Sequence, residues 1–363
     1  MAELINRFIE KFLSLPPNSS RDLGKPKNFL IIRQHNQLGD MLAGVSLFRA
    51  IKEKYPDCKI TVIASPANYQ AVKKNRYIDT LVNFNKKRLF SIFYFLRLIG
   101  VLRKGYDVVI VPVVVSISFT SNLLARLSKS TIRIGPESLE GKTNKSAYFF
   151  DRLVKLDWRH QPDSNVADRI LDIVRPFGIN TNNYRSEISF EKKDLLTAEK
   201  FIKTLDYTKK EILIGIHVGA GKPPNRWSLN KYIELIEKLK KEYAVCFYLT
   251  GSSADKEELD YMKKNLPFEI KVFLNHSIAE VAALVSKTHL FITNDTGIMH
   301  VAGATNTPQI SIFGPTNPFN WAPVGANKIF LRKSEFIDDI TVDDVYSACK
   351  MALSGKKQSK KQN

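Results

Sequence analysis

The stretch NFLIIRQHNQLGDMLAGVSLFRAIKEKYPDCKITVIA, residues 28–64, decides the fold. Its two ends are short apolar runs typical of buried strands, Asn28–Arg33 and Lys59–Ala64. The segment between them, Met41–Tyr55, has the apolar spacing of a helix. A strand, a helix and a second strand in this order form a βαβ unit with parallel strands. The sequence therefore predicts an α/β fold built on a doubly wound parallel sheet.

The same alternation continues along the chain in two series, separated by a polar run, Asn180–Arg185, that we interpret as a linker. The first series continues with the elements Pro66–Asn75, Thr80–Val82, Val108–Val115, Ile132–Ile134 and Val166–Pro176. The second series contains the strands Ile212–His217, Val245–Thr250, Lys271–Leu274, His289–Thr293 and Gln309–Phe313, and the helices Leu229–Glu242, Ala254–Asn265, Ile278–Ser286 and Gly297–Ala304.

The length of the chain favours two domains, because 363 residues exceed the roughly 250 at which a single core stops growing. We expect a Rossmann-like N-terminal domain over residues 26–185 and a Rossmann-like C-terminal domain over residues 186–353. Residues 1–25 are interpreted as an amphipathic extension, since charged residues interrupt the apolar run that a signal peptide needs. Residues 354–363 are expected to form a disordered basic tail.

The composition is that of a globular protein with a basic excess. Hydrophobic residues make up 44% and charged residues 25%, values that argue against disorder and against several membrane spans. The net charge is +19. Three scattered cysteines support neither a disulfide framework nor a thiolate metal site and fit a reducing compartment such as the cytoplasm. The six histidines form no HxxxH pair, so no metal site is expected.

The basic excess is concentrated between Phe84 and Arg133, which contain nine Lys or Arg and one acid. Within this region Arg88–Lys104 mixes bulky apolar and aromatic residues with basic ones, which suits a helix lying on an anionic membrane surface. A helix packed on a sheet with its basic residues at the rim explains the pattern equally well. The uncharged run Val108–Ala125 contains proline and polar residues, which favour a strand followed by a helix at Thr120–Leu127 over a membrane span.

In open α/β sheets, ligands bind beyond the carboxyl ends of the strands, so the loops that follow strands are the candidate sites. The first such loop is QHNQLGD, Gln34–Asp40. Asp40 either caps the helix expected to begin at Met41 or acts as a general base, because an ionised carboxylate can take a proton from a hydroxyl group. Both interpretations are open at this point.

The second loop, VGAGKPPNRW, covers Val218–Trp227. Small residues allow its backbone N–H groups to approach an anion, and two cations supply charge. The residues concerned are Gly219, Ala220, Gly221, Lys222 and Arg226. The loop lacks Walker A spacing, and no GxGxxG follows the first strand, so ATPase and dehydrogenase interpretations lose their main support.

Two further loops follow strands of the second series. In TGSSAD, Thr250–Asp255, Asp255 either binds a ribose hydroxyl or places a carboxylate at a helix N-terminus. In NDTGIMH, Asn294–His300, the helix that opens at Asp295, Thr296 and Gly297 would meet a pyrophosphate with its N-terminus. His300 lies about one helical turn further on.

Taken in order, the motifs LGD, VGAG with NRW, NDTGIMH, Phe313-Gly-Pro-Thr316, Trp321 and Pro323-Val-Gly resemble glycosyltransferase family 9, the ADP-heptose:lipopolysaccharide heptosyltransferases. The resemblance runs from about Asn28 to Leu353. It implies a GT-B fold in which two Rossmann-like domains face each other across a cleft, the first binding the acceptor and the second the nucleotide sugar. It also implies an inverting, metal-independent transfer at the cytoplasmic face of a membrane.

The resemblance also implies roles for particular residues. Asp40 matches the catalytic aspartate that deprotonates the acceptor hydroxyl. Asp295, Thr296, Gly297 and His300 match the motif that holds the donor diphosphate and sugar, and Asp255 lies near an acidic residue that contacts the ribose. Asn225 departs from the family, which commonly has lysine there, so Lys222 or Arg226 would have to supply the charge.

The leading hypothesis is therefore a transferase that moves heptose from ADP-heptose to a lipopolysaccharide-core or related lipid-linked acceptor, with Asp40 as base and without cofactor or metal. Its partners would be the nucleotide sugar, an anionic glycolipid and the inner surface of the cytoplasmic membrane. One alternative is a GT-B enzyme with a UDP- or GDP-hexose donor. Another is a non-catalytic nucleotide-binding or nucleic-acid-binding protein, although no nucleic-acid-binding signature accompanies the charge and no such partner is expected.

Overall fold

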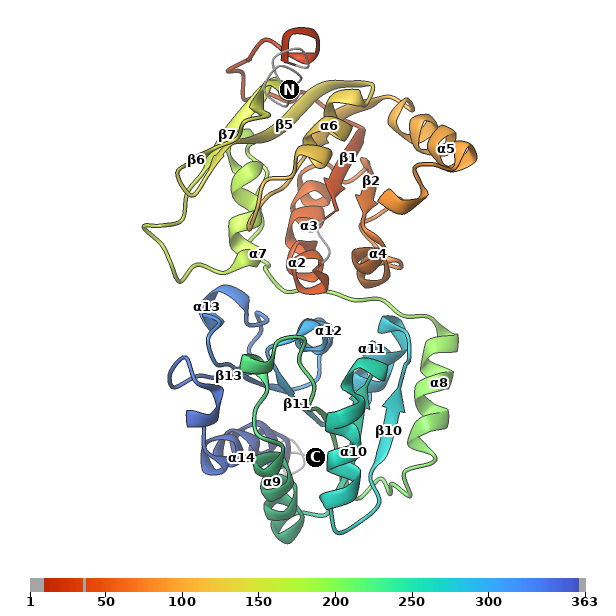
Figure 1. The fold of residues 1–363 in the computed structure, drawn as a ribbon, viewed down its shortest axis with the longest axis vertical. Coiled ribbons are helices and arrows are strands. Elements are labelled where there is room, and N and C mark those ends of the chain that lie inside the picture. The colour runs from red at the N-terminus through yellow and green to blue at the C-terminus, as the bar shows by residue number, and fades with distance from the viewer. Residues whose placement is uncertain (1–9, 35–36, 359–363) are drawn as a thin grey trace. The chain divides into compact units, whose positions relative to one another are not determined.

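The structure, a computed structural model, describes residues 10–34 and 37–358. The chain divides into two compact units, residues 1–184 and residues 185–363. Each unit contains one largely parallel sheet with helices packed on it (Figure 1). The sequence-based expectation of an α/β fold with two Rossmann-like sheets is confirmed.

The sheet of the N-terminal unit has the strand order β3-β2-β1-β4-β5, with the parallel strand β7 and the short antiparallel strand β6 both paired to β5. Its strands are β1 (Asn28–Arg33), β2 (Lys59–Ala64), β3 (Thr80–Asn83), β4 (Tyr106–Ile110), β5 (Ser130–Leu139), β6 (Lys142–Thr143) and β7 (Arg152–Leu156). The first two strands pair in parallel with Asn28 opposite Lys59, as a βαβ unit requires. Its helices are α2 (Leu38–Ala43), α3 (Val45–Lys54), α4 (Pro66–Val72), α5 (Ile92–Leu102), α6 (Phe119–Leu127) and α7 (Val166–Arg169).

The helix predicted at Met41–Tyr55 is in fact two helices that meet at Gly44. A side chain at position 44 would place its Cβ 3.1 Å from Cδ1 of Ile170 and 3.2 Å from the carbonyl oxygen of Asp40. Glycine therefore lets the chain bend close to its neighbours at this point. The first of the two helices also begins earlier than predicted, at Leu38.

The strand predicted at Ile132–Ile134 is longer, Ser130–Leu139, and the helix predicted at Pro66–Asn75 ends at Val72. Proline accounts for two further differences in extent. The strand predicted at Val108–Val115 ends at Ile110, because Pro112 lacks the N–H group that a central strand must donate. The helix predicted at Val166–Pro176 is a short α-helix followed by two 3-10 turns, the second of which contains Pro176. These turns end at Gly178 in the left-handed conformation.

The sheet of the C-terminal unit is fully parallel, with the order β10-β9-β8-β11-β12-β13. Its strands are β8 (Ile212–His217), β9 (Val245–Gly251), β10 (Lys271–Leu274), β11 (Leu290–Asn294), β12 (Gln309–Ile312) and β13 (Lys328–Leu331). Its helices are α8 (Lys192–Ile202), α9 (Leu229–Glu242), α10 (Lys256–Asn265), α11 (Ile278–Ser286), α12 (Gly297–Gly303), α13 (Pro318–Trp321) and α14 (Val342–Gln358). All five strands predicted in this half are confirmed, within one residue at each end.

The ends of the chain fall only partly within the described residues. The last helix extends to Gln358, so the part of the predicted disordered tail up to that residue is helical. The remaining tail residues, 359–363, and residues 1–9 of the predicted amphipathic extension lie outside the described residues. No helix in the described part of the chain is long and apolar enough to cross a membrane.

Candidate functional site

The strand order fixes where ligands can bind in each unit. It reverses direction between β1 and β4 in the N-terminal sheet and between β8 and β11 in the C-terminal sheet. In doubly wound sheets the crevice for ligands lies at this reversal, outside the carboxyl ends of the strands. Asp40 follows β1, and the glycine-containing loop Val218–Trp227 and Asp295 follow β8 and β11, so the predicted residues lie at these two positions.

Asp40 is buried in the first turn of α2, with 3% of its surface exposed. The residue that caps this helix is Gln37, so the interpretation of Asp40 as the cap was wrong. The buried guanidinium of Arg33, the last residue of β1, donates a hydrogen bond of 2.8 Å to the backbone carbonyl of Asp40. Burial lowers the pKa of Arg33, and the nearby Asp40 carboxylate opposes that shift. Asp40 is therefore a buried carboxylate beside a cation at the carboxyl edge of the sheet.

The neighbouring residue Gln34 holds the end of β1 against α6. Its side-chain amide donates to the hydroxyl oxygen of Ser121 at 2.9 Å. Arg33 was not among the predicted site residues, and its place at the end of an apolar strand was the only available signal. His35 and Asn36, between this anchor and α2, lie outside the described residues.

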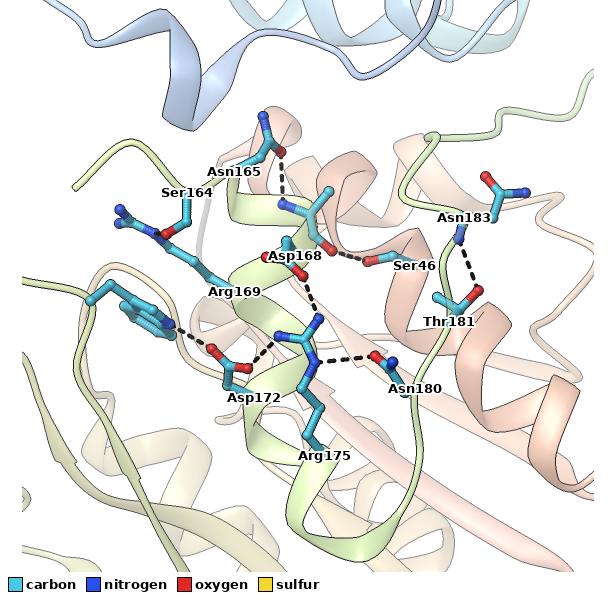
Figure 2. A network of polar contacts seen from close by, with 12 residues as sticks. Ser46, Ser164, Asn165, Asp168, Arg169, Asp172, Arg175, Asn180, Thr181 and Asn183 are labelled. Atoms are coloured by element: carbon cyan, nitrogen blue, oxygen red, sulfur yellow. Dashed lines mark hydrogen bonds and ion pairs between the residues drawn. The ribbon is translucent and has the colours of Figure 1, made fainter. Parts of the chain in front are cut away.

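A polar pocket of about 410 Å³ lies beside α7, lined by side chains of that helix, of the loop before it and of the 3-10 turns after it. Figure 2 shows part of the network that holds it, in which Arg175 forms ion pairs with Asp168 and Asp172. The indole of Trp158 donates to Asp172 at 2.6 Å. Ser46 of α3 donates to the carbonyl oxygen of Ala167 at 2.6 Å, which joins α7 to the helix that follows α2. The pocket and Asp40 therefore belong to one packed group of helices, since α2 also contacts α7.

In the C-terminal unit, the buried side chain of Asn294 at the end of β11 fixes the glycine-containing loop. Its amide nitrogen donates to the carbonyl oxygen of Val218 at 2.8 Å. Its amide oxygen accepts from the backbone N–H of Trp227 at 3.2 Å and from the hydroxyl of Tyr232 at 2.9 Å. Both ends of the loop are thus tied to one residue, which the sequence interpretation did not select.

Gly219 and Asp255 are brought into contact by the loops after β8 and β9. A Cβ added to Gly219 would lie 2.0 Å from Oδ1 of Asp255, so a side chain at this position would displace the Asp255 carboxylate. Oδ2 of Asp255 accepts from the backbone N–H and the hydroxyl of Ser252, at 2.8 and 2.9 Å, in a capping box. The carboxylate therefore stabilises a helical turn, as one of the two interpretations expected, and its other oxygen points at the glycine-containing loop.

The two cations of the loop differ in what they contact. Arg226 donates to the carbonyl oxygen of Ala220 at 2.9 Å and forms an ion pair of 2.5 Å with the buried carboxylate of Glu258. Arg226 thus organises the loop from within. Lys222 is exposed, next to Gly221, which has open space around its Cα. Of these two cations, Lys222 is therefore the one positioned to meet an incoming anion.

Asp295 is partly buried and contacts Asn225, the residue that departs from the family pattern. The amide nitrogen of Asn225 donates to Oδ2 of Asp295 at 3.0 Å. Burial raises the pKa of Asp295, while a hydrogen bond from Thr316 and the positive charge of Lys222 oppose the rise. A neutral amide therefore contacts this carboxylate directly, and the charge of Lys222 acts on it as well.

The helix α12 begins at Gly297, as predicted, and Thr296 occupies its N-cap position. The first N–H groups of a helix have no partner within it and point outward from its N-terminus. His300 is buried in the second turn, and burial lowers its pKa to about 4. Its ring lies edge-on to Trp321 of α13 at 6.4 Å between centroids. The imidazole is thus neutral at physiological pH and held against an aromatic side chain.

His217, at the end of β8, was also missed by the sequence interpretation. Its Nδ1 lies 3.0 Å from the carbonyl oxygen and 3.1 Å from the hydroxyl oxygen of Thr250. Burial lowers its pKa, and the carboxylates of Asp255 and Glu258 oppose the shift. The signal available was a polar residue closing an apolar strand just before the glycine-containing loop.

The arrangement in the C-terminal unit suits a ligand with negative charge and hydroxyl groups. Backbone N–H groups at a helix start, glycines that allow close approach and one exposed cation favour a diphosphate. Among residues 10–34 and 37–358, no group of three or more His, Cys, Asp or Glu side chains is placed to hold a metal ion.

Comparison with known proteins agrees with this arrangement. A sequence model of glycosyltransferase family 9 (heptosyltransferase) matches residues 95–343. The chain is 26% identical over 328 residues to lipooligosaccharide heptosyltransferase 2 of Haemophilus influenzae, with 85% of this chain and 89% of that protein covered.

Two solved structures have the same fold. The glycosyl transferase family 9 protein of Veillonella parvula has a TM-score of 0.79 at 21% identity, covering 92% of this chain and 98% of that one. The ADP-heptose lipopolysaccharide heptosyltransferase II of Escherichia coli has a TM-score of 0.73 at 19% identity, covering 90% of this chain and 99% of that one.

Proposed function

Since the chain belongs to glycosyltransferase family 9, the heptosyltransferase family, we propose that it transfers heptose from ADP-heptose to a lipopolysaccharide-core or related lipid-linked acceptor. The observation that carries the proposal is the family match over residues 95–343, which includes parts of both units. The name of the Escherichia coli relative, an ADP-heptose lipopolysaccharide heptosyltransferase, supports the donor and the acceptor class.

In the proposed reaction Asp40 acts as the general base. Its carboxylate takes the proton of an acceptor hydroxyl while that oxygen attacks the anomeric carbon of the heptose. The bond from the anomeric carbon to the diphosphate breaks on the opposite face, so the configuration inverts and ADP leaves. The position of Asp40 supports this role, because its buried carboxylate lies at the carboxyl edge of the sheet, where ligands bind, beside the guanidinium of Arg33.

The C-terminal unit is proposed to bind the donor without a metal or cofactor. The leaving diphosphate would be stabilised by the N–H groups at the start of α12, by those around Gly219 and Gly221, and by Lys222. Thr296 and His300 would contact the diphosphate and the sugar, and Asp255 the ribose. Asn225, which holds Asp295 through its amide, leaves Lys222 as the cation that replaces the lysine common in the family.

The acceptor is proposed to be an anionic glycolipid, reached from the cytoplasm at the inner surface of the cytoplasmic membrane. The polar pocket beside α7 supports an acceptor rich in hydroxyl groups in the N-terminal unit. No nucleic-acid partner is proposed.

Mass spectrometry of reaction products tests the proposal. The full-length protein is offered ADP-heptose with a panel of lipopolysaccharide-core acceptors and, in parallel, UDP- and GDP-hexoses with the same acceptors. The proposal expects an acceptor whose mass increases by one heptose residue only with ADP-heptose. A product formed only with a UDP- or GDP-sugar would reject the donor, and no product with any pair would reject the enzymatic function.

A further inference from the structure

The segment from β3 to β4 carries a cluster of large apolar side chains that the fold leaves exposed. Phe90 is 98% exposed and Phe93 is 83% exposed. Ile92, Phe95 and Leu96 are between 43% and 60% exposed. Five large apolar residues exposed within seven positions form a patch of the kind that marks an interaction site, since scattered single residues are the norm on protein surfaces. We call these five residues the α5 patch.

The helix α5 contacts its own unit through one narrow face only. Leu98 and Leu102, one turn apart, are its only buried residues. The hydroxyl of Tyr94 fastens the start of the helix, since it donates to the carbonyl oxygen of Asn83 at 2.9 Å and accepts from the N–H of Asn85 at 2.7 Å. Figure 1 shows the helix at the periphery of the unit. The helix is thus firmly attached while its other faces remain open, which argues against the interpretation of a helix packed flat on the sheet.

The charge around the patch has one sign. Residues 80–106 contain six basic side chains and no acidic one. The basic residues are Lys86, Lys87, Arg88, Arg97, Arg103 and Lys104. No ion pair involves any of them within the described part of the chain, although the guanidinium of Arg88 lies over the Tyr94 ring at 5.3 Å. Six cations without ion pairs beside exposed aromatic side chains suit a partner that is both anionic and able to accept apolar groups.

Three of these cations line a groove that runs along α5. The groove has a volume of about 870 Å³, and Arg88, Arg97 and Lys104 lie on its wall together with Phe93. Arg97 lies on α5, and Lys104 lies two residues beyond the last residue of that helix, Leu102. The α5 patch thus adjoins a groove with basic residues on its wall, and its volume of about 870 Å³ can hold a phosphate-bearing headgroup.

From these observations we propose that α5 and the turn before it form a membrane-docking surface for an anionic phospholipid bilayer. The α5 patch enters the boundary between headgroups and acyl chains, and Arg88, Arg97 and Lys104 bind lipid phosphates. A second copy of this chain is not the expected partner, because pairing the same surface of two copies would place six cations opposite six cations. Docking would bring the enzyme to the lipid-linked acceptor of the proposed function. The inference rests on the proposed function for this reason to dock, whereas the surface itself is argued from exposure and charge.

Vesicle co-sedimentation of the full-length protein tests the proposal. The probes are vesicles of phosphatidylcholine alone and of phosphatidylcholine mixed with phosphatidylglycerol. We expect binding to the anionic vesicles at least ~10-fold tighter than to the neutral ones, with a loss of binding at high salt. The double variant Phe90→Ser, Phe93→Ser and the double variant Arg97→Gln, Lys104→Gln should each weaken binding to anionic vesicles by ~10-fold or more.

Matched controls separate the surface from general stickiness and from misfolding. Phe336→Ser removes an aromatic side chain that is 66% exposed in the other unit, and Lys263→Gln with Lys264→Gln removes two exposed cations of α10. These controls should bind like the wild type, and all variants should have unchanged circular dichroism spectra.

Equal affinity for neutral and anionic vesicles would overturn the proposal, and so would wild-type binding by the double phenylalanine variant. Concentration-dependent self-association that this variant abolishes, without vesicle binding, would instead assign the surface to a protein contact. A failure here leaves transfer to a water-soluble core acceptor intact, whereas failure of the proposed function abolishes that transfer in every variant.

Discussion

The two units have the same strand order but place different chemistry at the carboxyl edge of the sheet. In the N-terminal unit the turn after β1 carries a single buried carboxylate, Asp40, beside the cation Arg33. In the C-terminal unit the turn after β8 is a glycine-containing loop that Asn294 holds at both ends. The first arrangement suits proton removal and the second suits binding of an anion.

The difference teaches that the scaffold supplies a position and the loops supply the chemistry. Both loops follow the first strand of their sheet, at the point where the strand order reverses. In the C-terminal loop, a side chain at Gly219 would collide with the carboxylate of Asp255. The proposed roles, proton removal in the N-terminal unit and anion binding in the C-terminal unit, therefore depend on the loops. Substitutions of particular loop residues should impair one role and leave the other intact.

The largest expected effect is on catalysis, in the N-terminal unit. Asp40→Asn keeps the shape of the side chain but removes its basicity, so turnover should fall by roughly 10² to 10⁴-fold. Initial rates of heptose transfer measure it. Asp57→Asn, at an exposed turn, is the control and should transfer heptose at the wild-type rate. Near-normal turnover of Asp40→Asn would show that Asp40 is not the general base and would contradict the contrast drawn between the two units.

A smaller effect is expected from Asn294→Ala in the C-terminal unit. The change leaves the carbonyl of Val218, the N–H of Trp227 and the hydroxyl of Tyr232 without their buried partner. The free energy of unfolding should fall by about 3 kcal/mol, and ADP should bind more weakly because the loop loses its anchor. Urea unfolding and calorimetric titration measure the two effects. The exposed Asn265→Ala should change neither, and an unaltered ADP affinity in Asn294→Ala would contradict the role of the anchor.

The third prediction concerns the pH dependence of the free energy of unfolding, to which His300 should contribute. Its pKa is about 4 in the folded protein against 6.5 for an ordinary histidine, so the unfolded chain binds more protons between these values. Stability should therefore fall as the pH is lowered from 6.5 towards 4, by up to ~3 kcal/mol from this residue, and His300 should contribute no slope above pH 7. Urea unfolding of wild type and His300→Gln at several pH values measures it.

The variant should have a shallower slope than the wild type over that window. Some dependence should remain, because burial also lowers the pKa of His217. The same dependence of the unfolding free energy on pH in the wild type and in His300→Gln would contradict the assignment of this dependence to His300.

The smallest effect is expected from Arg226→Gln. It breaks the ion pair with Glu258 and the bond to the carbonyl of Ala220, and because the arginine is partly exposed the loss should be about 1 kcal/mol. ADP affinity should fall less than with Lys222→Gln, since Lys222 is the exposed cation of the loop. Calorimetric titration compares the two variants, and a greater loss with Arg226→Gln would reverse the assignment of the charge.

Much of the fold could be predicted from the sequence because apolar periodicity reports burial directly. The strands β1, β2, β8 and β10 have the predicted bounds, since each is a compact apolar run between turn residues. The break at Gly44 could not be predicted, because it depends on the approach of Ile170 from a distant part of the chain. The end of β4 could have been predicted from the sequence, because Pro112 cannot donate the hydrogen bond that a longer central strand would need.

For the site, sequence motifs located the loops but not the contacts among them. The pairing of Gly219 with Asp255 and of Asn225 with Asp295 joins residues from different loops, which spacing alone does not reveal. The role of Asn294 was hidden because a polar residue at the end of a strand has many possible partners. The two interpretations of Arg88–Lys104 differed only in which side chains are exposed, and exposure is a property of the fold.

The most direct test of the division between the units is calorimetric titration of ADP, UDP and GDP into the wild type and Asp40→Asn in parallel. The account predicts that ADP binds both proteins with the same affinity and binds at least ~10-fold more tightly than UDP or GDP, a difference of about 1.4 kcal/mol. A preference for UDP or GDP, or an ADP affinity that falls with Asp40→Asn, would contradict it.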